Sequence, residues 1–182
     1  MPFLWHQAGE EVMSGSVTRH AVISECGRYR YLLTREWQEP LLLPHRACRL
    51  AFIMLNPSTA DGTVDDPTIR RCMGFAKREG YYGIEVVNLY ALRSTDPTEV
   101  ALSQDSAIGP ENDHYLRKIS LSCGEVIAAW GAWIFARERA RQVAEMLQGV
   151  TIKCLGVNKD GSPKHPLYVP KGAAFIPWEV SA

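Results

Sequence analysis

The chain has 182 residues with 20 basic and 20 acidic side chains, giving a formal net charge of +0 at pH 7, which excludes a global field drawing it to nucleic acid or an anionic membrane. The 46% hydrophobic and 22% charged residues are typical of soluble globular proteins and exclude an intrinsically disordered chain. We expect one domain over residues 1–182, with an N-terminal hairpin extension at 1–48 and a core at 49–178.

Residues 20–37, "HAVISECGRYRYLLTREW", predict a β-hairpin. Two alternating runs flank the turn at 26–28, and Tyr29, Tyr31 and Leu33 fall on one face. We expect this hairpin to cap the edge of a sheet.

The segment "RLAFIMLN" at 49–56 is a nearly continuous apolar run of strand length, typical of a central strand covered on both faces. Asp66 followed by Pro67 predicts a helix N-terminus, and apolar residues recur at helical spacing up to about Glu79. "GIEVVNLYAL" at 83–92 is the next strand. These segments predict a βαβ unit with a parallel strand pair.

The rest of the chain continues this alternation, with helices expected in 96–103 and 109–122, a strand at 125–131, a helix within 132–149 and a strand at 150–157. This order predicts an α/β fold, a three-layer α/β/α sandwich around a mostly parallel central sheet of about four strands, with the N-terminal β-hairpin added. Ligands of such sheets bind beyond the carboxyl ends of the strands. Asn56, Asn88, Gly131 and the loop of Lys164 and His165 are expected on that rim.

Three aspartates, Asp61, Asp65 and Asp66, gather before the first predicted helix. Carboxylates stabilise a helix N-terminus, and they would repel a phosphate from it. A cation, a water molecule to be activated, or a neutral ring is therefore the better expected occupant. A magnesium-dependent hydrolase built on these aspartates remains an open alternative.

Asn88 ends an apolar strand, where a carboxamide is out of place unless its polar atoms are used. It could read the edge of a nucleobase, or it could tie down a neighbouring loop. His165 lies in a proline-bracketed loop and could donate a hydrogen bond to a developing oxyanion, although a loop histidine is often without function.

The five cysteines are scattered without C-x-x-C spacing, which favours reduced thiols over a zinc site or a disulfide framework. The chain contains neither a signal-peptide pattern nor a run of about 20 apolar residues. We expect a cytoplasmic protein that needs no membrane, no resident metal and no cofactor; the oligomeric state is not readable.

Several motifs, taken in order, resemble those of the uracil-DNA glycosylase superfamily. "MLNPST" resembles the first motif of its mismatch-specific branch, "GIEVVNLYAL" the strand that ends in the uracil-recognising asparagine, "VIAAWGAWIFAR" the penultimate strand and its turn, and "KHPLYVPKGAAF" the closing His-Pro motif. The fuller pattern "LNPSTAD...DDPTIRR" resembles a bacterial and phage domain family of unassigned function.

The glycosylase resemblance implies a metal-free α/β/α fold in which a flipped base enters a pocket at the strand ends. By position, Asn56 would hold water, Asn88 would pair with the base edge and His165 would stabilise the departing base. The sequence departs from the superfamily where Asn56 stands at or beside the water-activating aspartate, and where Ser58 replaces a glycine.

These observations predict a nucleobase- or nucleoside-binding protein that hydrolyses an N-glycosidic bond; the alternative is a non-catalytic module that binds a nucleotide or nucleic acid. The expected catalytic residues are Asn56, Asp61, Asp65 and His165. The expected substrate-binding residues are Pro57, Ser58, Asn88, Tyr90, Gly131 and Lys164.

Overall fold

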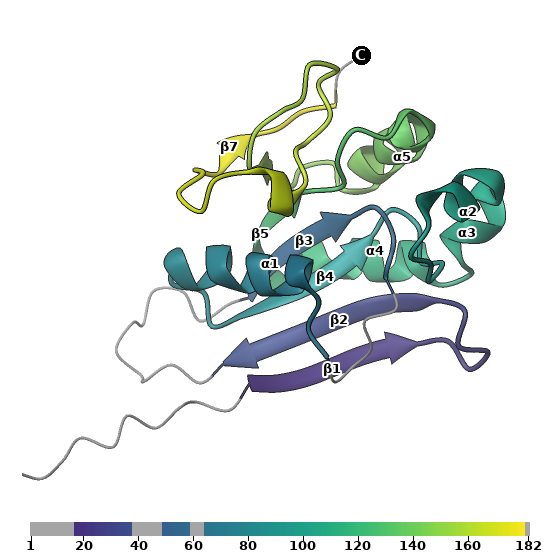
Figure 1. Ribbon diagram of the computed structural model, residues 1–182, viewed down its shortest axis with the longest axis horizontal. Coiled ribbons are helices and arrows are strands. Elements are labelled where there is room, and N and C mark those ends of the chain that lie inside the picture. Colours follow the sequence, from purple (N-terminus) through teal and green to yellow (C-terminus); the bar gives the residue numbers. More distant parts are fainter. Residues whose placement is uncertain (1–16, 38–48, 59–63, 181–182) are drawn as a thin grey trace, which may run out of the picture.

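The computed structural model describes residues 17–37, 49–58 and 64–180, and its strands form one seven-stranded sheet in the order β1-β2-β4-β3-β5-β6-β7 (Figure 1). The strands are β1 (Val17–Ile23), β2 (Arg30–Trp37), β3 (Arg49–Met54), β4 (Gly83–Asn88), β5 (Cys123–Ala128), β6 (Ile152–Cys154) and β7 (Ile176–Pro177). The α-helices are α1 (Pro67–Arg78), α2 (Pro97–Leu102), α3 (Gln104–Ile108), α4 (Asn112–Ser122) and α5 (Arg137–Met146), and two 3₁₀ turns are η1 (Ile134–Ala136) and η2 (Pro166–Tyr168).

The expected fold, with a mostly parallel central sheet of about four strands, is wrong, because the sheet is larger and mixed. β3 pairs in parallel with β4 and β5, and β5 with β6, whereas the β1/β2, β2/β4 and β6/β7 pairs are antiparallel. The hairpin caps the edge of the sheet, as expected, since β2 bonds to β4 with Leu33 opposite Val86, and it adds two strands to the expected number. At the other edge β7 is only two residues long, too short to leave a periodic pattern in the sequence.

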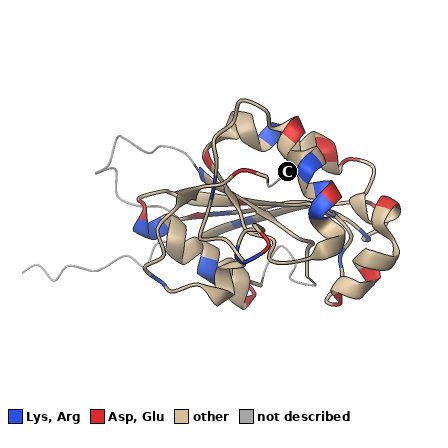
Figure 2. Cartoon of the chain, turned by 90° about the horizontal axis from the view of Figure 1, so that it is seen from above, with Lys and Arg blue, Asp and Glu red and all other residues tan. Residues whose placement is uncertain are grey.

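Helices cover both faces of this sheet (Figure 2). Alternation along β3 directs Leu50 and Phe52 into the core beneath α1, and Ala51 and Ile53 into the core beneath α4 and α5. Both residue sets are fully buried. The central strand is therefore apolar on both sides, which explains its continuous hydrophobic run.

Helix α1 begins at an Asp-Pro pair, as predicted. Asp66 caps it by accepting a hydrogen bond from the backbone N–H of Ile69 at 2.8 Å, and Pro67 occupies the first turn, where its missing N–H costs nothing. Further along the helix, Arg71 donates to the carbonyls of Pro166 and Val169. These bonds hold η2, and with it the His165 loop, against α1.

Two further expectations concern the cysteines and membrane helices. Cys26, Cys72, Cys123 and Cys154 are free thiols, while Cys48 lies outside the described residues. Within the described ranges, none of the helices combines the length and apolar character that a membrane crossing requires. The compartment stays an expectation from the sequence.

Candidate functional site

A pocket of about 250 Å³ opens beyond the carboxyl ends of β3 and β4, beside the first turns of α1 and α2. We call it the Asn88 pocket. Its lining consists of Arg30, Met54, Leu55, Asn56, Ser58, Asp66, Thr68, Ile69, Val86, Asn88, Ser94, Thr95, Pro97 and His165. Four residues singled out from the sequence, Asn56, Ser58, Asn88 and His165, therefore meet in one place.

Asn88 is the most unusual of these side chains. In β4 it follows Ile84 and Val86 at a spacing of two, so it takes the next place on the face covered by α1. The residue is 1% exposed, and neither its Oδ1 nor its Nδ2 has a hydrogen-bond partner among the described residues. An unsatisfied buried polar group costs about 1–3 kcal/mol. A carboxamide kept at that cost on the wall of a pocket is suited to a ligand that satisfies both atoms.

Asn56 is fixed by the backbone around it. Its Nδ2 donates to the carbonyl of Ser94 at 2.8 Å, and more weakly to the carbonyls of Pro57 and Leu92 at 3.2 and 3.5 Å. Because three carbonyls surround Nδ2, the orientation of the amide is determined, and Oδ1 is the atom that Asn56 can offer as an acceptor. A carboxamide oxygen orients a water molecule without removing its proton.

His165 has one ring nitrogen, Nε2, available to bond to a ligand. Its Nδ1 accepts a hydrogen bond from the backbone N–H of Leu167 at 3.3 Å, which places the proton of the neutral ring on Nε2. Burial lowers the pKa of His165 below its ordinary value of 6.5, and the nearby charge of Asp66 opposes this shift. At neutral pH the ring is therefore an uncharged hydrogen-bond donor through Nε2.

This lowered pKa gives a testable pH dependence of stability. Between the folded and unfolded pKa values the unfolded chain binds the extra proton, so stability increases with pH in that window. We expect the melting temperature of the wild type, relative to His165→Gln, to be constant above pH 6.5 and to decrease as the pH falls below it. Thermal unfolding followed by circular dichroism from about pH 5 to about pH 8 checks this. A difference that stays constant across this range would contradict the assigned shift.

Two opposite charges also line the pocket. Arg30 is 2% exposed; burial lowers its pKa to about 10, with Asp66 acting in the opposite direction, so it remains a cation at neutral pH. Asp66 accepts hydrogen bonds from Ser58 Oγ and from Ile69 N, both at 2.8 Å. Both carboxylate oxygens of Asp66 are thus engaged, which makes it a poorer acceptor for a proton from water.

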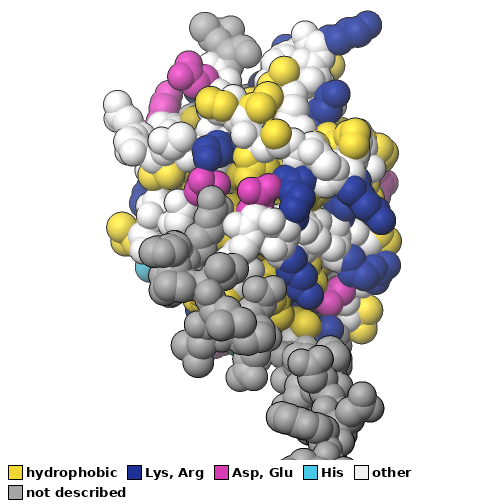
Figure 3. Space-filling view, turned by 90° about the vertical axis from the view of Figure 1, so that its left-hand side faces the viewer, with side chains coloured by type: hydrophobic (Ala, Val, Ile, Leu, Met, Phe, Trp, Pro, Cys, Tyr) yellow, Lys and Arg dark blue, Asp and Glu magenta, His cyan; other side chains and the backbone are white. Residues whose placement is uncertain are grey.

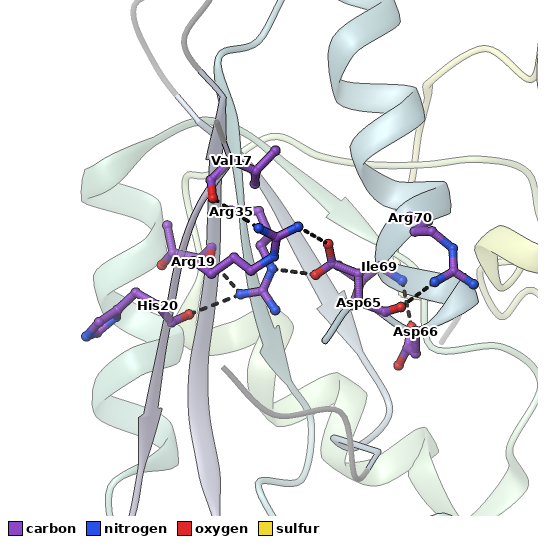
Figure 4. Close-up of polar contacts among 9 residues, drawn as sticks. Val17, Arg19, His20, Arg35, Asp65, Asp66, Ile69 and Arg70 are labelled. Carbon is purple, nitrogen blue, oxygen red and sulfur yellow. Dashed lines mark hydrogen bonds and ion pairs between the residues drawn. The ribbon is translucent and has the colours of Figure 1, made fainter. Parts of the chain in front are cut away.

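Asp65 does not line the pocket. Figure 4 shows its carboxylate facing the hairpin, where Oδ1 pairs with Arg35 Nε at 2.6 Å and Oδ2 with Arg19 at 3.3 Å. Its role in the structure is to join the start of α1 to β1 and β2. Asp61 lies outside the described residues. Within the described part of the chain there is no cluster of three His, Cys, Asp or Glu side chains suited to a metal.

The remaining expected site residues lie near the pocket or behind it. Pro57 accepts a backbone hydrogen bond from Ser94 at 3.0 Å and shapes the loop. Tyr90 packs in the core on the opposite face, and its hydroxyl donates to the carbonyl of Phe135. Gly131 adjoins His165, since a Cβ at Gly131 would lie 3.6 Å from His165 Cβ. Lys164 contributes a backbone bond to Gly156 and does not line the pocket.

Sequence reasoning missed Arg30, Ser94 and Thr95. No pattern in the sequence says that β2 lies next to β4, and this pairing is what brings Arg30 to the pocket. A signal did exist for the other two residues. The tripeptide Asp-Pro-Thr occurs at 66–68 and again at 96–98, and in both cases the aspartate caps a helix that begins beside the pocket.

Residues 30–167 match the family described as "Protein of unknown function (DUF1643)". The chain belongs to this family. The DUF1643 region runs from Arg30 to Leu167 and contains every residue that lines the Asn88 pocket. The expectation of a family of unknown function is thereby confirmed, whereas nothing in the comparisons supports the resemblance to uracil-DNA glycosylases. Comparisons with curated proteins and with solved structures found no match.

Proposed function

We propose that this DUF1643 protein binds a nucleobase in the Asn88 pocket and hydrolyses the N-glycosidic bond that joins the base to its sugar. The observation that carries the proposal is the buried carboxamide of Asn88, with both polar atoms unpartnered among the described residues. An amide donor and acceptor side by side match the C=O and N–H of a lactam edge, as in uracil or hypoxanthine.

The pocket also suits the departure of such a base. When the bond between the sugar C1′ and the base nitrogen breaks, the electron pair stays on the base, whose carbonyl oxygens share the negative charge. His165 Nε2–H and Asn88 Nδ2–H are donors that strengthen as this charge develops. A neutral His165 supplies a hydrogen bond here without requiring an acidic pH.

The attacking water would be held by Asn56, which is a weaker base than a carboxylate. Asn56 Oδ1 can orient a water molecule, whose oxygen then bonds to C1′ while a proton is released and one is taken up by the base. The carboxylate of Asp66 already accepts two hydrogen bonds. We therefore expect bond cleavage to run ahead of water attack, and the best substrates to be those with good leaving groups.

The surface of α1 favours a substrate that carries phosphates. Lys and Arg side chains gather along one side of the face in Figure 3. On α1 and the adjoining loop the cations are Arg70, Arg71, Lys77, Arg78 and Lys171. Arg71 and Arg78 bond to backbone carbonyls of the C-terminal loop, which fixes their position and leaves their charge in place; Glu79 pairs with Arg78. Contacts of Lys and Arg side chains with the phosphates of a nucleic acid raise the affinity of binding without reading its base sequence.

The test is a base-release assay on single- and double-stranded oligonucleotides that carry uracil or hypoxanthine, with uridine and inosine as free nucleosides. We expect release that Asn88→Leu abolishes and that His165→Gln slows by about a hundredfold, within the range for one oxyanion donor. Asn158→Leu is the matched control, because Asn158 is an asparagine whose Nδ2 bonds within its own loop, away from the pocket.

One observation favours a second candidate, a non-catalytic module that binds a base or nucleotide. Asp66 is the one carboxylate among the described pocket residues, and both of its oxygens are engaged. Binding that depends on Asn88 without any release of base would establish this candidate. Neither binding nor release from any of the substrates, with the protein folded, would refute both.

A further inference from the structure

A second cavity, of about 190 Å³, lies between α5 and the turn at 160–162 and shares no lining residue with the Asn88 pocket. Figure 1 shows α5 beside the C-terminal loops that complete it. We name it the tryptophan cavity, after Trp130, Trp133 and Trp178. We propose that it binds a planar aromatic ring that carries an anionic group, such as the base and phosphate of a nucleotide. This proposal does not depend on the function proposed for the Asn88 pocket.

The floor of the tryptophan cavity is a rigid aromatic corner. The rings of Trp130 and Trp178 meet edge to face, with centroids 5.0 Å apart and planes at 89°. Trp178 is fixed further, because its Nε1 donates to the carbonyl of Gly161 at 3.0 Å. Trp133 is 39% exposed and adds a third indole at the edge of the cavity. Aromatic corners of this kind stack and surround flat rings at little entropic cost.

The cavity also contains an unused donor. Trp130 is 4% exposed, and its indole N–H has no hydrogen-bond acceptor among the described residues, in contrast to that of Trp178. Trp130 Nε1 is not among the buried side-chain atoms without a partner, so this N–H reaches solvent and can accommodate an acceptor. A ring nitrogen or a carbonyl oxygen on a bound ligand would supply one, which favours a heteroaromatic ring over a hydrocarbon.

The rim supplies guanidinium groups. Arg137 and Arg141 line the cavity together with one carboxylate, Asp160. Arg137 pairs with Asp160 at 3.2 Å and Arg141 pairs with Glu138, yet both arginine side chains remain about half exposed, at 56% and 50%. A guanidinium has five N–H donors and can bind a phosphate or carboxylate through two of them. Besides these bonds to Asp160 and Glu138, the half-exposed guanidinium groups keep N–H donors for the anionic end of a ligand whose ring lies on the tryptophans.

The volume limits the ligand. Sites for drug-sized molecules occupy about 300–1,000 Å³, so about 190 Å³ accommodates one ring, with its charged group at the open rim. A free nucleotide, one residue of a nucleic-acid strand and an aromatic acid share this chemistry. The experiment separates recognition of a nucleotide from recognition of any aromatic anion.

The experiment is a titration of intrinsic tryptophan fluorescence, since three of the five tryptophans line the cavity. It uses the Asn88→Leu protein, in which the first pocket is disabled, and four probes: uridine 5′-monophosphate, phenyl phosphate, uridine and inorganic phosphate. We expect saturable quenching by the two probes that combine ring and phosphate. Uridine and inorganic phosphate should each bind at least about tenfold more weakly. Tighter binding of the nucleotide than of phenyl phosphate identifies nucleotide recognition, and equal binding identifies a general aromatic-anion site.

Variants then locate the site. Trp133→Ala and Arg141→Gln change exposed side chains. Each should weaken the binding of uridine 5′-monophosphate by about tenfold, and Arg141→Gln should leave the binding of uridine unchanged. Trp37→Phe is the matched control, because Trp37 lies in the α1 core, away from the tryptophan cavity. The proposal is overturned by a lack of saturable quenching at millimolar probe. It is also overturned by quenching that both variants leave unchanged.

Discussion

Replacing Asn88 by leucine should weaken ligand binding strongly and leave the protein as stable as the wild type or more stable. Leucine branches at Cγ like asparagine and carries no polar atom, so it removes a carboxamide that finds no partner among the described residues. Relief of that unsatisfied amide is worth about 1 kcal/mol, or roughly 2–4 °C in melting temperature for a chain of this size. Loss of two hydrogen bonds to the ligand should weaken binding by about 30-fold or more.

Asn112→Leu is the matched control for this experiment. Asn112 is also fully buried, and its Oδ1 likewise has no partner among the described residues, but its Nδ2 donates to the carbonyls of Asn88 and Leu89, both at 3.0 Å. Removing it takes one donor from each carbonyl, although the Leu89 carbonyl keeps its bond from Arg139 Nε at 2.9 Å, and we expect a loss of about 2 kcal/mol. If Asn88→Leu destabilised the fold as Asn112→Leu does, the Asn88 carboxamide would be structural and the proposed base recognition would fail.

The helices and the central strands could be predicted because their signals are local. Helix starts are predicted by two Asp-Pro pairs, Asp66 with Pro67 and Asp96 with Pro97, because capping involves only neighbouring residues. The extent of the sheet could not be predicted in this way. Whether the hairpin stands apart or joins β4 depends on pairing across about 50 residues of chain, as in Leu33 with Val86, and alternation within β2 is the same in either case.

The candidate site shows the same division between local and long-range information. Asn56 and Asn88 end apolar strands, and parallel neighbours bring strand ends together, so the pairing of Met54 with Asn88 follows from the pattern. Asp65 and Asp66 are adjacent in sequence and look equivalent there. The structure separates them, since Asp66 turns into the helix cap and the pocket while Asp65 turns to Arg35 on another strand. No pattern in the sequence predicts which of the two aspartates faces the pocket.

The position of Asp65 implies a second large effect, this time on stability. Its partner Arg35 has a side chain that is 0% exposed, and Asp65 is itself 11% exposed. Asp65→Asn removes the negative charge facing a buried guanidinium, and breaking one side of a buried pair typically costs about 3–5 kcal/mol. We expect a loss of about 3 kcal/mol, near the low end because Asp65 retains some contact with solvent. Urea unfolding at neutral pH measures it.

Two further variants decide whether this loss comes from the buried pair. Arg19→Gln removes the other partner of Asp65, which is 38% exposed and 3.3 Å away, and an exposed pair of that kind contributes about 1 kcal/mol or less. The double variant Arg35→Met with Asp65→Asn removes both charges and should recover much of the stability that Asp65→Asn loses. A single Asp65→Asn variant as stable as the wild type would mean that Asp65 does not hold the hairpin to α1.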